Sequence, residues 1–149
     1  MDALRRLKSA VRELSMAAPC PEPKIQTAEK RLGQRLPDVL RAVYKITNGF
    51  CGPTGAQFLW PIGRQRQSLV GLNLFFRQDL FPPMVRNWVL FGDEGGGAMW
   101  AIDPKKPDQV IRWDAEWGDD FEIAGQDPFE AWARKQAAYD EAEQRLDKR

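Results

Sequence analysis

Residues 88–103 constrain the fold most, because two apolar stretches flank a glycine-rich turn within them. The stretches, residues 88–91 and 98–102, are short and rich in aromatic and β-branched side chains, a composition typical of strands. The three glycines at positions 95–97 are expected to adopt positive φ and so let the chain reverse tightly. Since both stretches are almost continuously apolar, we predict a central antiparallel hairpin covered on both faces.

Three helices are predicted before this hairpin. In residues 2–15 apolar side chains recur every three or four positions, which indicates an amphipathic helix with a basic outer side. We expect it to dock on the core of its own domain rather than to act as a free arm for protein or nucleic acid. Residues 19–23 contain three prolines and predict an extended connector. A second helix should end at Gly33, and a third should run from Pro37 to Asn48.

The closing helix is predicted from its start signals. Asp127 is a capping residue, Pro128 suits the first helical position, and Glu130 completes a capping box. Its apolar face is expected to contain three residues that recur every seven positions: Trp132, Tyr139 and Leu146.

Further strands are predicted at residues 58–60 and 110–113, whereas residues 63–87 suit either a helix or a strand. The predicted fold class is therefore α+β, with a central, mainly antiparallel sheet and with N-terminal helices and a C-terminal helix packed around it. At 149 residues the chain should form one domain, of which residues 1–23 supply an additional helix and its connector.

Composition predicts a cytoplasmic protein. The chain is 43% hydrophobic, yet no apolar run approaches the roughly 20 residues that cross a bilayer, and the first residues lack an apolar signal-peptide core. Cys20 and Cys51 are the only cysteines and are far apart, which favours a reducing compartment.

The chain contains no histidine, which excludes histidine-based triads, general bases and metal ligands. Asp93 and Glu94, beside the glycine turn, suit a metal-binding or acid–base pair, but we favour a structural turn. Neither a phosphate loop nor a dinucleotide fingerprint is present there. Cys51 has no histidine to activate it as a nucleophile. We therefore predict no catalytic residue, no bound metal and no cofactor.

Charge is unevenly distributed, although the net charge is only +1. Residues 1–92 carry 14 Lys and Arg against 6 Asp and Glu, whereas residues 93–149 carry 8 against 15. The acidic segment, residues 113–127, contains six carboxylates and no basic residue after Trp113. It suits either a solvated loop or an interface in which tryptophans anchor a cationic partner. The predicted partner-binding residues are Trp113, Asp114, Glu116, Trp117, Asp119, Asp120 and Glu122.

The order of these motifs resembles the SUKH superfamily. The predicted helix pair of this chain carries Ile25, Glu29, Leu36 and Pro37 and ends at Asn48-Gly49. It resembles the helix pair with which the superfamily's domain opens. Its later landmarks follow in order: Leu59-Trp60-Pro61, the turn at residues 91–97, Val110-Ile111 and Asp127-Pro128-Phe129. The resemblance covers roughly residues 24–135, and residues 2–15 and 63–87 depart from the pattern.

The resemblance implies an α+β domain without a cofactor that binds protein partners rather than catalysing a reaction. The superfamily includes fungal cell-wall-synthesis regulators and bacterial immunity proteins that are thought to neutralise toxins. We therefore predict an antitoxin that occludes the surface of a protein toxin, for example a basic nuclease, without a nucleic-acid or membrane partner. The alternative is a regulatory or scaffold protein with an endogenous partner. A divalent-metal enzyme that uses Asp93 and Glu94 is the third and least favoured hypothesis.

Overall fold

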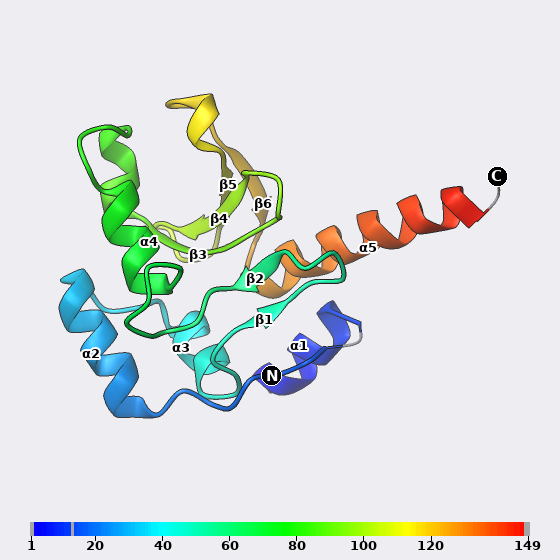
Figure 1. Ribbon diagram of the computed structural model, residues 1–149, viewed down its shortest axis with the longest axis horizontal. Helices are drawn as coiled ribbons and strands as arrows, with labels where there is room; N and C mark the ends of the chain where they lie inside the picture. Colours follow the sequence, from blue (N-terminus) through cyan, green and yellow to red (C-terminus); the bar gives the residue numbers. More distant parts are fainter. Residues whose placement is uncertain (1, 13, 148–149) are drawn as a thin grey trace.

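The computed structural model describes residues 2–12 and 14–147, and over these residues it contains five α-helices, two 3-10 helices and six strands (Figure 1). In chain order they are α1 (Ala3–Ala10), α2 (Glu22–Leu32), α3 (Asp38–Tyr44), β1 (Phe50–Cys51), β2 (Gln57–Leu59), α4 (Leu69–Phe76), η1 (Pro83–Asn87), β3 (Val89–Asp93), β4 (Met99–Ile102), β5 (Val110–Trp113), η2 (Ala115–Trp117), β6 (Glu122–Gly125) and α5 (Pro128–Asp147). This architecture confirms the predicted α+β fold class. None of the helices in the described ranges is long and apolar enough to cross a membrane.

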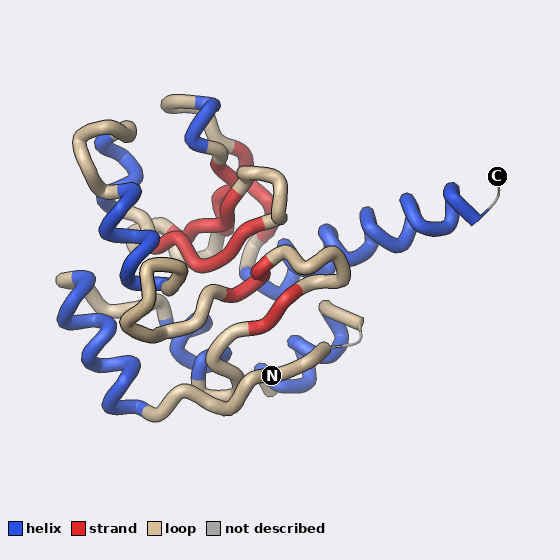
Figure 2. The backbone as a smooth tube through the Cα atoms, viewed as in Figure 1, coloured by secondary structure: helices blue, strands red, loops and turns tan. Residues whose placement is uncertain are grey.

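A four-stranded antiparallel sheet lies at the centre, in the order β3-β4-β5-β6 (Figure 2). Its first two strands are the predicted hairpin, in which Val89 pairs with Ile102. A second sheet, formed by β1 and β2, adjoins β3, where the Trp60 amide donates a hydrogen bond of 2.8 Å to the Phe91 carbonyl. The strands predicted at residues 58–60 and 110–113 are confirmed, the first shifted by one residue.

Glycine meets two different requirements in the hairpin. Gly95 and Gly97 adopt φ of +87° and +106°, as expected for the reversal. Gly96 does not adopt positive φ, and a Cβ there would meet nothing within 4 Å, so the prediction for this position is wrong. At Gly92 a Cβ would lie 2.0 Å from the Phe58 carbonyl oxygen, so only glycine lets β2 approach β3 this closely.

The hairpin is covered on both faces, as its continuous apolar pattern predicts. On one face Phe91 and Trp100 join a cluster that also contains Trp132 of α5 and Leu7 of α1. On the other face a second cluster is formed with residues of α4, η1 and the segment after β5. Because side chains alternate along a strand, neighbouring positions of β3, β4 and β5 contribute to opposite clusters.

The amino-terminal helix docks on the core, as predicted, but it is shorter than residues 2–15. α1 ends at Ala10 because Val11 adopts an extended conformation with φ of −128°; residue 13 of the predicted range lies outside the described residues. Leu7 is fully buried, and Val11 is only 2% exposed even though it follows the helix. Arg6 forms an ion pair with Asp127, which joins α1 to the start of α5.

The pair α2 and α3 follows the prediction with changes at its boundaries. α2 begins at Glu22, so Pro23 lies in its first turn rather than in the connector, a position that proline tolerates. Gly33, with φ of +74°, caps its end as predicted. Glu29 pairs with Arg41 across 3.1 Å and so joins α2 to α3. The third helix ends before the expected stop at residue 48.

Residues 63–87, whose sequence suits either a helix or a strand, contain α4 and η1. Ser68 caps α4 by accepting a hydrogen bond from the Gly71 amide, 3.1 Å away. The buried side chain of Asn73 donates to the Leu90 carbonyl over 2.8 Å and accepts from the Leu90 amide over 2.9 Å. Asn73 therefore binds both backbone groups of Leu90 and holds α4 against the sheet.

The closing helix begins as predicted, since the Asp127 side chain accepts a hydrogen bond of 3.0 Å from the Glu130 amide. Trp132 is fully buried, but Leu146 is 66% exposed, so the prediction that Leu146 belongs to the packed face is wrong. The reason is the length of α5. Twenty helical residues span about 30 Å, and the second half of α5 reaches beyond the sheet (Figure 1).

Candidate partner-binding surface

Six aromatic rings form a continuous series on the sheet face that α4 covers. Successive members are Phe75, Phe76, Phe81, Trp113, Trp88 and Phe121, and we refer to them as the aromatic series. The centroids of Trp88 and Phe121 are 5.3 Å apart, and those of Phe76 and Trp113 are 5.9 Å apart. Trp113 and Trp88 are buried, whereas Phe75 and Phe121 are each 47% exposed. The aromatic series therefore reaches solvent at both ends.

Additional apolar side chains extend the exposed ends of the aromatic series. Ile123 of β6 pairs with Ile111 of β5, so both side chains lie on the face that carries this series. Ile123 is 48% exposed, since β6 is the edge strand of the sheet. Leu80, in the segment after α4, is 81% exposed. Figure 1 shows this segment and the loop between β5 and β6 at the same end of the molecule.

The acidic segment is more ordered than the predicted loop. It contains η2 and the short strand β6, which the sequence analysis missed. The indole of Trp113 donates a hydrogen bond of 2.9 Å to the Gly118 carbonyl, so a buried ring fixes the turn after η2. Gly118 itself adopts φ of +63°, a conformation that favours glycine.

The six carboxylates of this segment do not remain a single cluster of free charge. Glu122 pairs with Arg112 at 3.0 Å, Asp127 caps α5, and Asp114 accepts a hydrogen bond from the backbone at the start of η2. The remaining three are exposed and form no ion pair with another described residue: Glu116, Asp119 and Asp120. The uncompensated charge therefore lies in the turn that precedes Phe121.

Arg112 organises the opposite side of this segment. Its guanidinium binds the Glu94 carboxylate through two hydrogen bonds of 2.8 and 3.0 Å, and these raise the pKa of Arg112 above its ordinary value. The same guanidinium lies 5.1 Å from the centre of the Trp117 ring, a cation–π contact. Since neighbouring side chains of β5 point to opposite faces, Trp117 lies with Arg112 and away from Trp113.

The structure therefore divides the seven predicted partner-binding residues. Trp113 has no exposed side-chain surface for a partner, so its function is to hold the acidic segment in place. Trp117 is partly exposed, and Asp119 and Asp120 are exposed. The sequence analysis did not identify Phe75, Leu80 and Ile123, since residues 63–87 gave no clear pattern and β6 was not recognised as a strand. The alternation of Phe121 and Ile123 was the available signal.

Asp93 and Glu94 serve the hairpin, as the structural interpretation predicts. One oxygen of Asp93 accepts from the Trp60 indole over 2.8 Å, and the other accepts from the Gly95 amide over 2.9 Å. Glu94 pairs with Arg112 and lies 3.7 Å from the ammonium of Lys135. Among the described residues no group of three or more candidate ligands could hold a metal ion.

The two cysteines are both free. Burial raises the pKa of the Cys20 thiol, which keeps it protonated and unreactive at neutral pH. Cys51 is exposed at the end of β1 and belongs to none of the clusters described above.

Comparison with known protein families identifies this arrangement of helices and strands. No curated protein sequence matches the chain. The model of the family described as SMI1 / KNR4 family (SUKH-1) matches residues 19–135, from the end of the connector after α1 to the first half of α5. This range covers more than three quarters of the chain and includes the whole sheet. The chain belongs to the SMI1/KNR4 (SUKH-1) family.

Proposed function

We propose that this protein is an immunity protein that binds a bacterial toxin and occludes its active surface. The observation that carries the proposal is the exposed apolar edge formed by Phe121 and Ile123, beside the exposed carboxylates of Asp119 and Asp120. Aromatic side chains next to charged groups are typical of the residues that supply most of the affinity in protein interfaces. Membership of the SUKH-1 family is consistent with this role.

The two kinds of residue have separate tasks in the proposed interface. Phe121 and Ile123 enter an apolar recess of the toxin and exclude water, while Asp119, Asp120 and Glu116 attract and orient a basic surface. A nucleic-acid-degrading toxin suits these carboxylates, because its phosphate-binding surface is basic. The protein would then occupy the position of the nucleic acid.

We also propose that the protein acts without catalysis, in the cytoplasm and as a single domain. The carboxylates at the glycine turn are engaged by Trp60, Arg112 and Lys135, and the exposed thiol of Cys51 has no histidine in the chain to activate it. Binding alone is sufficient for an immunity protein, and the recognition surface lies on a rigid sheet edge that suits such a role.

The test is co-expression with the product of the adjacent open reading frame, scored by growth rescue and by co-purification. We expect the wild-type protein to restore growth and Ile123→Arg to lose rescue, because a buried guanidinium would meet an apolar recess. Leu146→Arg is the matched control, since it introduces the same charge at an exposed apolar residue near the far end of α5. It should rescue fully.

Protein abundance is measured in parallel, so that a loss of rescue is separated from a loss of folded protein. Rescue by Ile123→Arg at normal abundance would place the interface elsewhere. If the protein binds a non-toxic endogenous protein and restores no growth, the regulatory or scaffold role is the correct one.

A further inference from the structure

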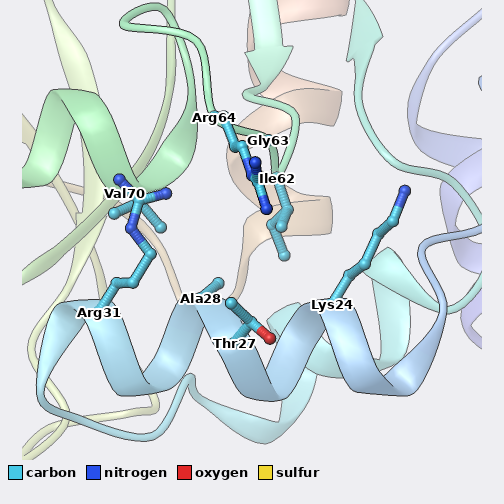
Figure 3. A pocket seen from close by; sticks show the side chains of 8 residues that line it. All are labelled: Lys24, Thr27, Ala28, Arg31, Ile62, Gly63, Arg64 and Val70. Carbon is cyan, nitrogen blue, oxygen red and sulfur yellow. The ribbon is translucent and has the colours of Figure 1, made fainter.

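A second surface, which shares no residue with the aromatic series, has the opposite charge to the acidic segment. A groove of about 600 Å³ lies between α2 and the segment that leads from β2 to α4 (Figure 3). Three of its lining residues are cationic: Lys24 and Arg31 of α2, and Arg64 on the opposite wall. Its floor is apolar and includes Ala28, Ile62 and Val70.

The cations of this groove are not used by the fold. In the described part of the chain, none of Lys24, Arg31 and Arg64 forms an ion pair, although ten other basic residues do. Like charges gathered around one depression repel each other unless water, salt or an anionic ligand screens them. Their arrangement around an apolar floor therefore indicates an anionic ligand with apolar groups of its own.

The spacing of the cations indicates the shape of that ligand. Lys24, Thr27, Ala28 and Arg31 follow each other at helical intervals along one face of α2, and Figure 3 shows them in a row below the loop that carries Arg64. Arg31 lies seven positions after Lys24 in α2, a rise of about 10 Å along the helix axis. An extended peptide covers this distance with three residues.

We propose that this groove binds an acidic segment of a protein partner, in an extended conformation parallel to α2. Alternating side chains of such a segment place apolar residues on the floor and carboxylates against the cationic walls. None of the described residues that line the groove has an aromatic ring on which a nucleic-acid base could stack, so a single-stranded nucleic acid suits the groove less well. The proposal does not depend on a toxin, since the groove and the aromatic series share no residue.

The probe is a fluorescein-labelled nine-residue peptide in which glutamate alternates with leucine, and its binding is followed by fluorescence anisotropy. We expect saturable binding that weakens as salt is raised, and no binding of the peptide in which glutamine replaces every glutamate. Arg31→Glu or Arg64→Glu should weaken binding at least tenfold.

Lys30→Glu is the matched control, because Lys30 also lies in the last turn of α2 but does not line the groove. It should change the affinity less than twofold. A second pair of variants leaves the charge unchanged: Thr27→Trp fills the groove and should abolish binding, whereas Gln26→Trp on the same helix should have no effect. Thr27 and Gln26 are both exposed, so the fold should tolerate a tryptophan at either position.

Five results would overturn the proposal, four of them from the probes and the charge variants. They are equal weakening by Lys30→Glu, equal binding of the glutamine peptide, tighter binding of a nine-residue oligothymidylate than of the acidic peptide, and no binding of the acidic peptide at all. Binding that survives Thr27→Trp would likewise place the peptide at another surface, such as the edge of β6.

Discussion

The two faces of the central sheet carry aromatic clusters of similar size, but only one of them is closed to solvent. The closed one, which we refer to as the sealed cluster, consists of Phe50, Phe58, Phe91, Trp100, Phe129 and Trp132. No member is more than 5% exposed. The guanidinium of Arg6 lies 4.4 Å from the centre of the Phe129 ring and completes the cover from α1. The aromatic series on the other face instead ends at two half-exposed phenylalanines.

The difference arises from the elements that cover each face. The sealed cluster lies beneath the first half of the 20-residue α5, which α1 supports, whereas the aromatic series has only the eight-residue α4, η1 and the acidic segment. Aromatic rings that remain half exposed contribute less to folding and more readily to recognition. We therefore expect variants of the sealed cluster to affect stability, and variants at the ends of the aromatic series to affect binding.

Trp132→Ala should have the largest effect, a loss of about 3–5 kcal/mol in the free energy of unfolding. The centroid of its ring lies 4.8 Å from that of Phe50 and 5.7 Å from that of Phe129. Its indole N–H donates a hydrogen bond of 3.0 Å to the Phe58 carbonyl. Thermal and denaturant unfolding measure the change. The matched control is Trp117→Ala, which removes the same side chain from a partly exposed site. If both variants lost the same stability, the burial of Trp132 in the sealed cluster would not explain its contribution.

Glu29→Gln should have an intermediate effect, because it weakens the contact between two helices that cover the sealed cluster. We expect the free energy of unfolding to fall by about 1.5–3 kcal/mol at neutral pH. The Glu29 side chain is 14% exposed, pairs with Arg41 and accepts a hydrogen bond of 2.7 Å from the Leu36 amide. Glutamine retains the shape but loses the charge.

The pH dependence of stability tests the same contact. Burial alone would raise the pKa of Glu29, but the hydrogen bonds from Arg41 and Leu36 outweigh it and lower the pKa below 4.5. Its contribution is therefore present above pH 4.5 and is lost as the pH falls through the lower, folded-state pKa. Denaturant unfolding between pH 3 and 7 should show a steeper acid loss for the wild type than for Glu29→Gln. Parallel curves would contradict the assignment.

Local sequence signals predicted much of this architecture, because they depend on neighbouring residues. The apolar stretches around residues 95–97, the cap at Asp127 and the left-handed glycine at position 33 each specify a short segment by their own chemistry. Contacts between distant segments were not predictable in this way. Arg112, for example, compensates Glu94 and Glu122 only because β4 and β6 both pair with β5.

The candidate surface was predicted only in part for the same reason. Residues 69–76, Leu-Val-Gly-Leu-Asn-Leu-Phe-Phe, are apolar on every side, so no periodicity shows that Phe75 faces solvent. Trp113 was expected at the surface because acids surround it in sequence, yet its strand position directs it into the core. Ile123 lies in a four-residue strand, so the alternation of Phe121 and Ile123 offers a signal of two apolar positions, too few to define a strand.

Phe121→Ala should lower the free energy of unfolding by less than about 1 kcal/mol, because the Phe121 side chain is 47% exposed. In complex with the proposed partner it should accelerate dissociation at least tenfold, as expected for an apolar anchor. Surface plasmon resonance separates the two rate constants. Phe75→Ala removes the other exposed end of the aromatic series and shows whether both ends contact the proposed partner. A large loss of stability without faster dissociation would assign Phe121 to the core.

The smallest effect on folding is expected for the double variant Asp119→Lys with Asp120→Lys. These exposed carboxylates form no ion pair with another described residue, so thermal unfolding should be nearly unchanged. Association with a basic toxin should slow at least tenfold, while dissociation changes little, because exposed charges mainly steer the encounter. Raising the ionic strength should slow association of the wild type and reduce the difference between the two proteins. Glu143→Lys with Asp147→Lys, on the distant half of α5, reverses the same charge and serves as the control. Equal slowing by both double variants would mean that net charge, rather than this surface, attracts the partner.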